Sequence, residues 1–257
     1  MPELPEVETL CRQLRRKIRG RQIKACAVYD EKLSGIKNQA GRTVTDVKRT
    51  GKMLEIALDN GEAIYIHLRM TGRLLWQDDC SLPPHTRWKA AFPHGNVVLI
   101  DPRRFATVNV LVKSPVPGNL DIFRSFDLTA FIAKNGRRKT TIKALLMDQN
   151  AVSGIGNIYA CEILHQTGIN PEKPPSDLQK ADWEKLFTAA ARILKKAIAC
   201  RGTSVSDWRD LTGRKGVNQH ELKVYGREGL PCFNCGTVIR RKKQNGRSTF
   251  FCPRCQK

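Results

Sequence analysis

The N-terminus carries residue types that can act on an electrophilic carbon. The chain begins Met1-Pro2-Glu3, and an initiator Met is normally removed before a small residue. Removal would leave the secondary amine of Pro2 as the true N-terminus. An α-amino group has a pKa of about 7.7–8.0, so a useful fraction of it is neutral and nucleophilic at physiological pH. With the Glu3 carboxylate beside it to move protons, this amine has the parts for imine formation with an aldehyde-like carbon.

The same residues also suit an ordinary helix start. Proline is favoured at the first position of a helix, and carboxylates near a helix N-terminus are stabilised by the helix dipole. From Val7 to Ile18 apolar residues recur at helical spacing, which predicts one amphipathic helix directly after the prolines. On these residues alone the structural explanation is the stronger, and the rest of the chain has to decide.

The charge balance indicates a polyanionic partner. The 257 residues contain 45 Lys and Arg against 24 Asp and Glu, for a net charge of +21 spread over the whole chain. Nucleic acid is the commonest partner of such a protein. The sequence has no apolar run of the length that a membrane span needs, and its acidic N-terminus is unlike a secretory signal or a transit peptide. We therefore expect a cytoplasmic protein that associates with the nucleoid through DNA.

Four cysteines near the C-terminus have the spacing of a metal site. Cys232 and Cys235 form one CxxC pair, Cys252 and Cys255 form another, and 16 residues separate the pairs. Such pairs build a tetrahedral thiolate cage for one zinc ion, and because cysteine fills all four positions the zinc would be structural. The segment between the pairs is basic, which favours a nucleic-acid contact. Five further cysteines are scattered, as expected for unpaired thiols in a reducing cytosol.

Hydrophobic periodicity divides the chain into a β-rich part and a helical part. Between residues 22 and about 112 the period is two, which predicts a sandwich or barrel with strands at 44–47, 53–58, 63–68 and 96–100 and a hairpin turn at 59–61. Residues 114–119 have the composition of a linker. Beyond it we expect helices at 129–133, 140–148, 157–166 and 176 to about 200, with Ser176-Asp177 capping the last. Residues 203–217 are polar, basic and glycine-containing, and we expect a mobile loop there.

A glycine turn precedes the helix expected at 157–166. The segment Ser153-Gly154-Ile155-Gly156 would leave backbone N–H groups at the helix N-terminus, where a phosphate binds well, and Asn157 adds a side-chain donor. Glycines at this spacing also serve plain tight turns, so the motif is weak by itself.

Taken together, these motifs resemble the formamidopyrimidine-DNA glycosylase family. The resemblance is carried, in the same order along the chain, by Pro-Glu-Leu-Pro-Glu-Val-Glu at 2–8, Asp-Pro-Arg-Arg-Phe at 101–105, Gly-Asn-Ile-Tyr-Ala at 156–160 and the terminal zinc finger. It covers essentially the full length. Leu4, in place of glycine, resembles the formamidopyrimidine branch of the family and not the endonuclease VIII (Nei) branch.

The resemblance implies an α+β multi-domain fold. A catalytic β-sandwich with an N-terminal helix would occupy residues 1–113, followed by a linker at 114–125. A helical helix–two-turn–helix domain would occupy 126–223, with a lesion-capping loop near 203–219, and a β-hairpin zinc finger would occupy 224–257.

The resemblance also implies catalytic roles for four residues. Pro2 would attack C1′ of the damaged nucleotide and form a Schiff base, and Glu3 would assist opening of the sugar ring. Lys52 would donate a proton during β-elimination and contact DNA. Arg247 would grip the phosphate of the lesion and assist δ-elimination.

A second implied set of residues binds DNA. Asn157 would be a phosphate ligand, and Met70, Arg103 and Phe105 would form the wedge that fills the gap left by a flipped base, a task that suits their chemistry. Further DNA or lesion contacts are expected at His67, His85, Arg138, Lys139 and Lys143. Simpler alternatives stay open: Met70, Phe105 and His67 as core residues, and Arg104, Arg138 and Lys139 as solvated charges.

The implied activity is that of a DNA glycosylase and abasic-site lyase. A monomer with one structural zinc would remove oxidised purines, 8-oxoguanine and formamidopyrimidines, from duplex DNA and cleave the strand by β,δ-elimination. Two alternatives stay open: a Nei-type enzyme for oxidised pyrimidines, and a non-catalytic zinc-ribbon DNA-binding protein. Val217-Asn218 stands where relatives commonly have an aromatic pair, and residues 86–89 are unusually basic, so the preferred base is the least certain part.

Overall fold

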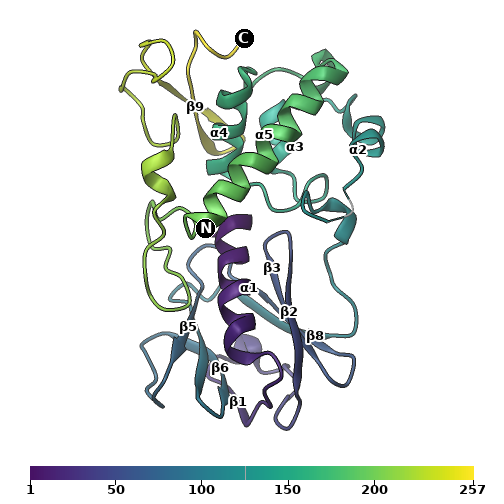
Figure 1. Cartoon of the computed structure of the whole chain (residues 1–257), viewed down its shortest axis with the longest axis vertical. Helices are drawn as coiled ribbons and strands as arrows, with labels where there is room; N and C mark the ends of the chain where they lie inside the picture. Colours follow the sequence, from purple (N-terminus) through teal and green to yellow (C-terminus); the bar gives the residue numbers. More distant parts are fainter. Residues whose placement is uncertain (125) are drawn as a thin grey trace. The chain divides into compact units, whose positions relative to one another are not determined.

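A computed structural model describes residues 1–124 and 126–257 of the chain, which form two compact units (Figure 1). The first unit comprises Met1–Val116 with Cys200–Gln219, and the second comprises Pro117–Ala199 with His220–Lys257. Among the described residues no helix is long and apolar enough to cross a membrane. The expected combination of an N-terminal domain of sheets and a helix, a helical domain and a C-terminal zinc hairpin is confirmed.

The described part of the first unit contains two antiparallel sheets that share one core. One sheet has the order β1 (Ala25–Val28), β6 (Thr86–Phe92), β7 (Gly95–Ile100) and β5 (Arg73–Gln77). The other has the order β2 (Val44–Thr50), β3 (Met53–Leu58), β4 (Ala63–His67) and β8 (Thr107–Leu111). A short 3-10 helix, η1 (Glu31–Leu33), follows β1. Apolar residues of both sheets, among them Ile56, Leu74 and Trp88, pack in a single buried cluster.

The four strands expected from their apolar residues were predicted correctly. The segments expected at 44–47, 53–58, 63–68 and 96–100 are β2, β3, β4 and β7, and the turn at 59–61 joins β3 to β4 with Gly61 at φ +80°. The strands β1, β5, β6 and β8 were not anticipated. β1 is partly or fully exposed along its length, and β6 carries Arg87 and Lys89, so neither shows a simple alternation of apolar and polar residues.

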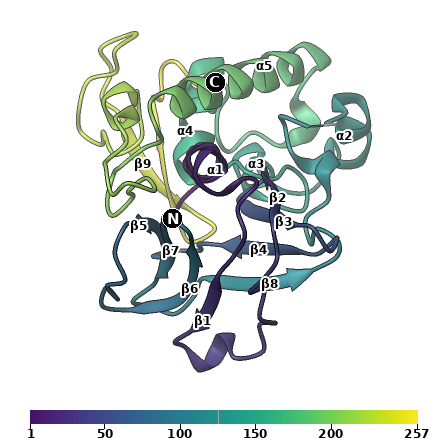
Figure 2. The same cartoon turned by 60° about the horizontal axis from the view of Figure 1, so that its bottom comes forward.

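Helix α1 (Leu4–Ile18) packs on the sheet of β2 and β3 (Figures 1 and 2). Its buried face includes Leu10, Leu14 and Ile18, which confirms the helix expected from the spacing of these residues. The helix starts earlier than residue 7, because Pro5 occupies its first turn and Glu3 and Glu6 form a capping box.

The described part of the second unit is helical, apart from one hairpin. Its helices are α2 (Leu128–Asn135), α3 (Ile142–Met147), α4 (Asn157–Thr167) and α5 (Lys180–Ala199), with short 3-10 turns η2 (Gly118–Leu120) and η3 (Pro175–Asp177). The hairpin pairs β9 (Arg240–Gln244) with β10 (Arg247–Phe251). Thr141 caps α3 by accepting from Ala144 N.

The expected cap of the longest helix was wrong. Ser176-Asp177 belongs to η3, and the extended backbone of Leu178 separates that turn from α5. The side chain of Asp182 accepts from Gln179 N at 3.0 Å and so satisfies a donor at the true start of the helix. The polar residues Ser176 and Asp177 therefore mark the short turn η3 that precedes α5, and they do not cap the helix.

The segment Cys200–Gln219 packs within the first unit. Apart from η4 (Asn218–Glu221), it has no helix or strand among its described residues. Trp208 and Leu211 are nevertheless buried. Gly202 has φ +81°, and a Cβ built on it would lie 2.8 Å from Cγ of Glu6. Only glycine allows this close approach to α1; the mobility expected for residues 203–217 stays a prediction.

Shortening a buried side chain of α1 should destabilise the first unit. Leu14 is fully buried, so Leu14→Ala should lower the free energy of unfolding by about 2–5 kcal/mol. Urea unfolding measures this change. Arg16→Ala on the exposed face of the same helix is the matched control and should change stability little; equal effects of the two variants would contradict the packing of α1.

Candidate functional site

A buried carboxylate fixes the N-terminal segment. Pro2 is buried and Glu3 is 3% exposed, whereas Met1 is 38% exposed. Glu3 N donates to Glu6 Oε2 at 2.7 Å, and Thr203 N donates to Glu6 Oε1 at 2.8 Å. Glu6 thus joins the start of α1 to the segment Cys200–Gln219. The capping box was not recognised in the sequence, although the spacing of Glu3 and Glu6 was its signal.

The turn that carries Lys52 is tied to the same helix. Lys52 lies between β2 and β3 and is 5% exposed. Arg49 Nε bonds Glu8 Oε2 of α1 at 2.9 Å, and Arg49 Nη1 donates to Gly51 O at 2.9 Å. Because the side chain of Arg49 is almost fully buried, these two hydrogen bonds are well shielded from solvent. The structure therefore brings the turn of Lys52 against the helix that begins beside Pro2.

His67 is held as a neutral imidazole at the end of β4. Its Nδ1 accepts from Arg69 N at 3.0 Å, so the ring proton belongs on Nε2. Burial, together with the nearby charges of Arg69 and Lys52, lowers the pKa of His67 to about 4. The side chain is half-buried rather than part of the apolar core. His67 thus supports the loop that leads to Met70.

The three proposed wedge residues project from two loops. Met70 and Phe105 are 47% and 46% exposed, which excludes the alternative that they belong to the core. The guanidinium carbon of Arg103 lies 4.7 Å from the centroid of the Phe105 ring. His85 directly precedes β6 and is exposed. Its carbonyl accepts from Asp101 N at 3.0 Å. Met70 and Phe105 are therefore accessible to a binding partner.

In the second unit, two of the expected residues meet at β10. Lys143 Nζ donates to Ser248 O at 3.1 Å and Thr249 Oγ1 at 2.7 Å, and Asn157 Nδ2 donates to Ser248 O at 2.9 Å. Lys143 is 1% exposed, so its ammonium braces the hairpin from inside. Arg247 directly precedes Ser248 and is exposed. The structure therefore presents Arg247 to solvent on a strand that α3 and α4 support.

The remaining basic candidates lie between α2 and α3. Arg138 and Lys139 are both exposed. Arg138 Nη1 forms an ion pair with Asp148 Oδ2 at 2.8 Å, with a side chain that is 42% exposed. Exposed pairs of this kind contribute little to stability, so Arg138 can exchange this partner for another anion at small cost.

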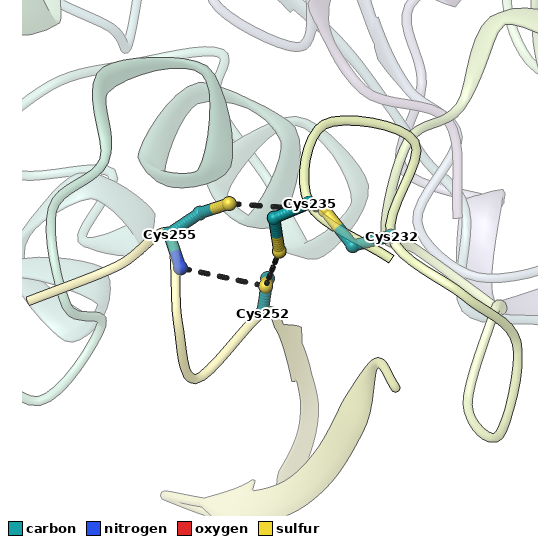
Figure 3. Close-up of side chains that lie close together, drawn as sticks. All are labelled: Cys232, Cys235, Cys252 and Cys255. Carbon is teal, nitrogen blue, oxygen red and sulfur yellow. Dashed lines mark hydrogen bonds between the residues drawn. The ribbon is translucent and has the colours of Figure 1, made fainter. Parts of the chain in front are cut away.

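The four C-terminal cysteines form one compact cluster (Figure 3). Their sulphur atoms all lie within 4.8 Å of one another, with Cys232 and Cys255 at 3.9 Å and Cys235 and Cys252 at 3.5 Å. A tetrahedral zinc site with Zn–S bonds of about 2.3 Å requires sulphur atoms about 3.8 Å apart. The donor set and spacing therefore fit one zinc ion, as predicted.

Some supporting residues were missed by the sequence analysis. His165 Nε2 of α4 lies 3.4 Å from Cys232 Sγ, a position suited to hydrogen bonding with a zinc ligand. Asp101 accepts from groups in two loops, although its sequence motif drew attention only to the arginines and phenylalanine. No sequence signal indicated the contact of His165 with Cys232 or that of Asp101 with Thr71, because each joins segments far apart in the chain.

Three protein-family models match successive parts of the chain. Residues 1–108 match the formamidopyrimidine-DNA glycosylase N-terminal domain, and residues 119–208 match the formamidopyrimidine-DNA glycosylase H2TH domain. Residues 229–257 match the zinc finger found in FPG and IleRS.

Curated relatives are similar over all or nearly all of the chain. A formamidopyrimidine-DNA glycosylase of Desulfitobacterium hafniense is 37% identical over 278 residues, with 100% of each chain covered. That of Moorella thermoacetica is 40% identical over 258 residues, with 94% of each covered. A Lactococcus lactis FPG mutant in complex with DNA containing Fapy-dG has a TM-score of 0.89 and 31% identity, covering 100% of both chains. MutM in complex with DNA containing carbocyclic 8-oxo-G has a TM-score of 0.88 and 31% identity at the same coverage.

The stability of the protein should depend on pH through His67. The unfolded imidazole takes up a proton near its ordinary pKa of about 6.5, whereas the folded one does so only near about 4. Between these values the unfolded state binds more protons, so this group makes stability fall as pH decreases from 6.5 to 4 and adds no slope outside that window. Urea unfolding of His67→Gln should show a shallower slope there than the wild type.

The matched control for this measurement is His94→Gln. His94 is exposed on the turn between β6 and β7. This variant should keep the wild-type slope. An unchanged slope in His67→Gln would contradict a neutral imidazole with a lowered pKa at this position.

Zinc removal should weaken DNA binding. Chelation takes away the ion that holds the two cysteine pairs together, and the hairpin that presents Arg247 should unfold with it. Fluorescence anisotropy with a labelled duplex should show an affinity at least about tenfold lower, equivalent to about 1.4 kcal/mol. Cys80→Ser, which alters an exposed cysteine outside the cluster, should bind normally. Unchanged affinity after verified zinc loss would contradict a DNA contact by the hairpin.

Proposed function

The chain belongs to the formamidopyrimidine-DNA glycosylase family and is an enzyme that excises oxidised purines from DNA and cleaves the strand at the resulting site; we propose that Pro2 is its nucleophile. The observation that carries this proposal is the fixed N-terminal segment. Pro2 is buried beside Glu3, and Glu6 holds both through the backbone of Glu3 and that of Thr203. A terminal amine that would otherwise fray is thereby given a defined place.

The proposed chemistry starts with removal of Met1. While Met1 is attached, the nitrogen of Pro2 is a tertiary amide without a nucleophilic lone pair. As a free amine it attacks C1′ of the damaged nucleotide, and the C1′–N bond to the base breaks. Glu3 transfers a proton to the sugar-ring oxygen as the ring opens, which leaves an iminium at C1′.

Strand cleavage follows from the electron demand of that iminium. The iminium accepts the electron pair of the C2′–H bond, so the C2′ proton is lost and the 3′-phosphate leaves in a β-elimination. A second, δ-elimination releases the 5′-phosphate. Lys52 is the proposed proton donor in the first elimination, and Arg247 is proposed to hold the phosphate during the second. The zinc ion is structural and maintains the hairpin.

The proposed DNA-binding residues divide into two tasks. Met70, Arg103 and Phe105 fill the space left by the extruded base, which their exposure on adjoining loops supports. Phosphate and lesion contacts are proposed for Asn157, His67, His85, Arg138, Lys139 and Lys143. For the buried Lys143 the present contact to β10 supports an indirect contribution through Arg247.

The proposed organisation places domain boundaries after residues 113, 125 and 223. The enzyme is proposed to act as a monomer, since a single chain carries the complete set of proposed catalytic residues. A location in the cytoplasm on the nucleoid is proposed from its net charge of +21 and its DNA substrate.

Covalent trapping tests the nucleophile directly. Sodium borohydride should reduce the iminium to a stable protein–DNA adduct when Met-processed enzyme reacts with a duplex containing 8-oxoguanine opposite cytosine. Pro2→Gly keeps a terminal amine with poorer geometry. The initial rate of adduct formation should therefore be at least about tenfold lower. A form that retains an extra residue before Pro2 should not trap.

Two controls accompany this experiment. A duplex with thymine glycol should be processed more slowly than the 8-oxoguanine duplex, as the family assignment requires. Arg16→Ala, on the exposed face of α1, should trap at the wild-type rate. Full trapping by protein with a blocked N-terminus would show that another amine is the nucleophile.

A further inference from the structure

One buried carboxylate joins the two loops that carry the proposed wedge. Met70 is in the loop between β4 and β5, and Arg103 and Phe105 are in the loop between β7 and β8. Asp101, at the start of the second loop, is 1% exposed. Thr71 Oγ1 of the first loop donates to Asp101 Oδ1 at 2.5 Å. A single side chain therefore contacts both loops.

Within its own loop, Asp101 accepts from three backbone groups. Arg103 N donates to Oδ1 at 3.2 Å, and Phe105 N and Ala106 N donate to Oδ2 at 2.7 and 2.6 Å. Two of these donors belong to wedge residues themselves. Charge-assisted hydrogen bonds of this kind are short and directional, so they fix where the backbone of each residue lies.

The backbone of both loops is strained next to the wedge residues. Arg69, which precedes Met70, has φ +55°, and Arg104, between Arg103 and Phe105, has φ +57°. Residues other than glycine rarely adopt this left-handed conformation and keep it only where surrounding contacts enforce it. The bonds from Phe105 N and Arg103 N to Asp101 enforce it on both sides of Arg104.

Hydrogen bonds keep Asp101 in its ionised form, and the buried Arg87 lies beside it. Burial acts to raise the pKa of Asp101, but hydrogen bonds from Ala106 N, Thr71 and Phe105 N lower it, and the net shift is downward. Arg87 is 2% exposed, with Nη1 lying 3.5 Å from Asp101 Oδ2 and donating to Ala106 O at 2.5 Å. The guanidinium of Arg87 also pairs with Asp30. Arg87, one of the basic residues noted at 86–89, thus pairs with the buried carboxylates of Asp30 and Asp101.

We propose that Asp101 is a positioning residue that makes the two loops act as one wedge during base extrusion. It fixes the Phe105 loop through backbone N–H groups and the Met70 loop through Thr71. The side chains of Met70, Arg103 and Phe105 therefore enter the DNA together. This inference rests on the wedge role proposed above. Asp101 does not touch the reacting atoms, so its loss should impair extrusion and leave the chemistry of an exposed abasic sugar intact.

The first test replaces Asp101 by asparagine. Both carboxylate oxygens accept from backbone N–H groups, so in either orientation the NH2 group of asparagine replaces an acceptor and at least one bond is lost. Excision of 8-oxoguanine from duplex DNA should slow by roughly tenfold to a hundredfold. Cleavage of an abasic site in single-stranded DNA, which needs no extrusion, should stay within about twofold of the wild type because the groups at Pro2 are untouched.

A spectroscopic readout follows the wedge itself. With 2-aminopurine opposite the lesion, insertion of the wedge unstacks the probe and raises its fluorescence. Asp101→Asn should slow this rise by a factor similar to that for excision. Thr71→Val keeps the side-chain shape and removes only the bond between the loops, so it should slow the rise by a smaller factor, roughly threefold to tenfold.

Control variants separate the possible failures. Asp79→Asn alters a carboxylate that also accepts a backbone N–H in a loop of the same unit, and it should behave as the wild type. If Met70→Ala and Phe105→Ala slow the fluorescence rise but Asp101→Asn and Thr71→Val do not, the positioning role is wrong and the wedge assignment stands. If none of the four variants slows it, the wedge assignment fails and the inference falls with it.

A merely structural role for Asp101 is also distinguishable. In that case Asp101→Asn would slow the duplex and single-strand reactions by the same factor and lower the unfolding midpoint, while Thr71→Val would have no effect. This outcome would overturn the proposal.

Discussion

The N-terminal site depends on the buried carboxylate of Glu6. It is 2% exposed and accepts from Glu3 N and Thr203 N, so its two oxygens hold the start of α1 and the segment Cys200–Gln219 together. Removing such a group would leave two buried donors without an acceptor, which costs more than the bonds themselves contribute. Gly202 permits the approach, because a Cβ there would collide with Glu6. The position of Pro2 follows from this contact, because Pro2 directly precedes Glu3, the N-cap residue of α1.

Buried charged groups also fix the segments of the other candidate residues. Arg49 links the turn of Lys52 to Glu8, Asp101 links the loops of Met70 and Phe105, and Lys143 braces the strand that follows Arg247. In each case a buried charged group bonds backbone or side-chain partners. These bonds fix the segment that carries a neighbouring functional side chain. Buried charges are weak sources of stability but strong constraints on geometry. Catalysis by positioning requires that kind of constraint on loops that would otherwise move.

The sequence was informative wherever function or structure is encoded locally. We predicted the helix α1, four apolar strands and the hairpin at 59–61 because each depends on neighbours within a few residues. The two cysteine pairs were predicted from fixed ligand chemistry. The start of α5 was placed too early because the turn η3 has the same polar residues as a helix cap. The strand β6 was missed because its buried Arg87 is paired with Asp30, 57 residues away.

What could not be predicted is the set of partners that long-range folding supplies. Lys143 lies 105 residues from Ser248, and Glu6 lies 197 residues from Thr203. Nothing near either residue in the sequence indicates those contacts. The central claim, that the N-terminal amine is the nucleophile, is tested most directly by mapping the borohydride-reduced adduct by mass spectrometry after protease and nuclease digestion. The mass of the sugar remnant should lie on the peptide that begins with Pro2, on its terminal nitrogen. An adduct on Lys52 or any other lysine, with an unmodified N-terminal peptide, would contradict the account.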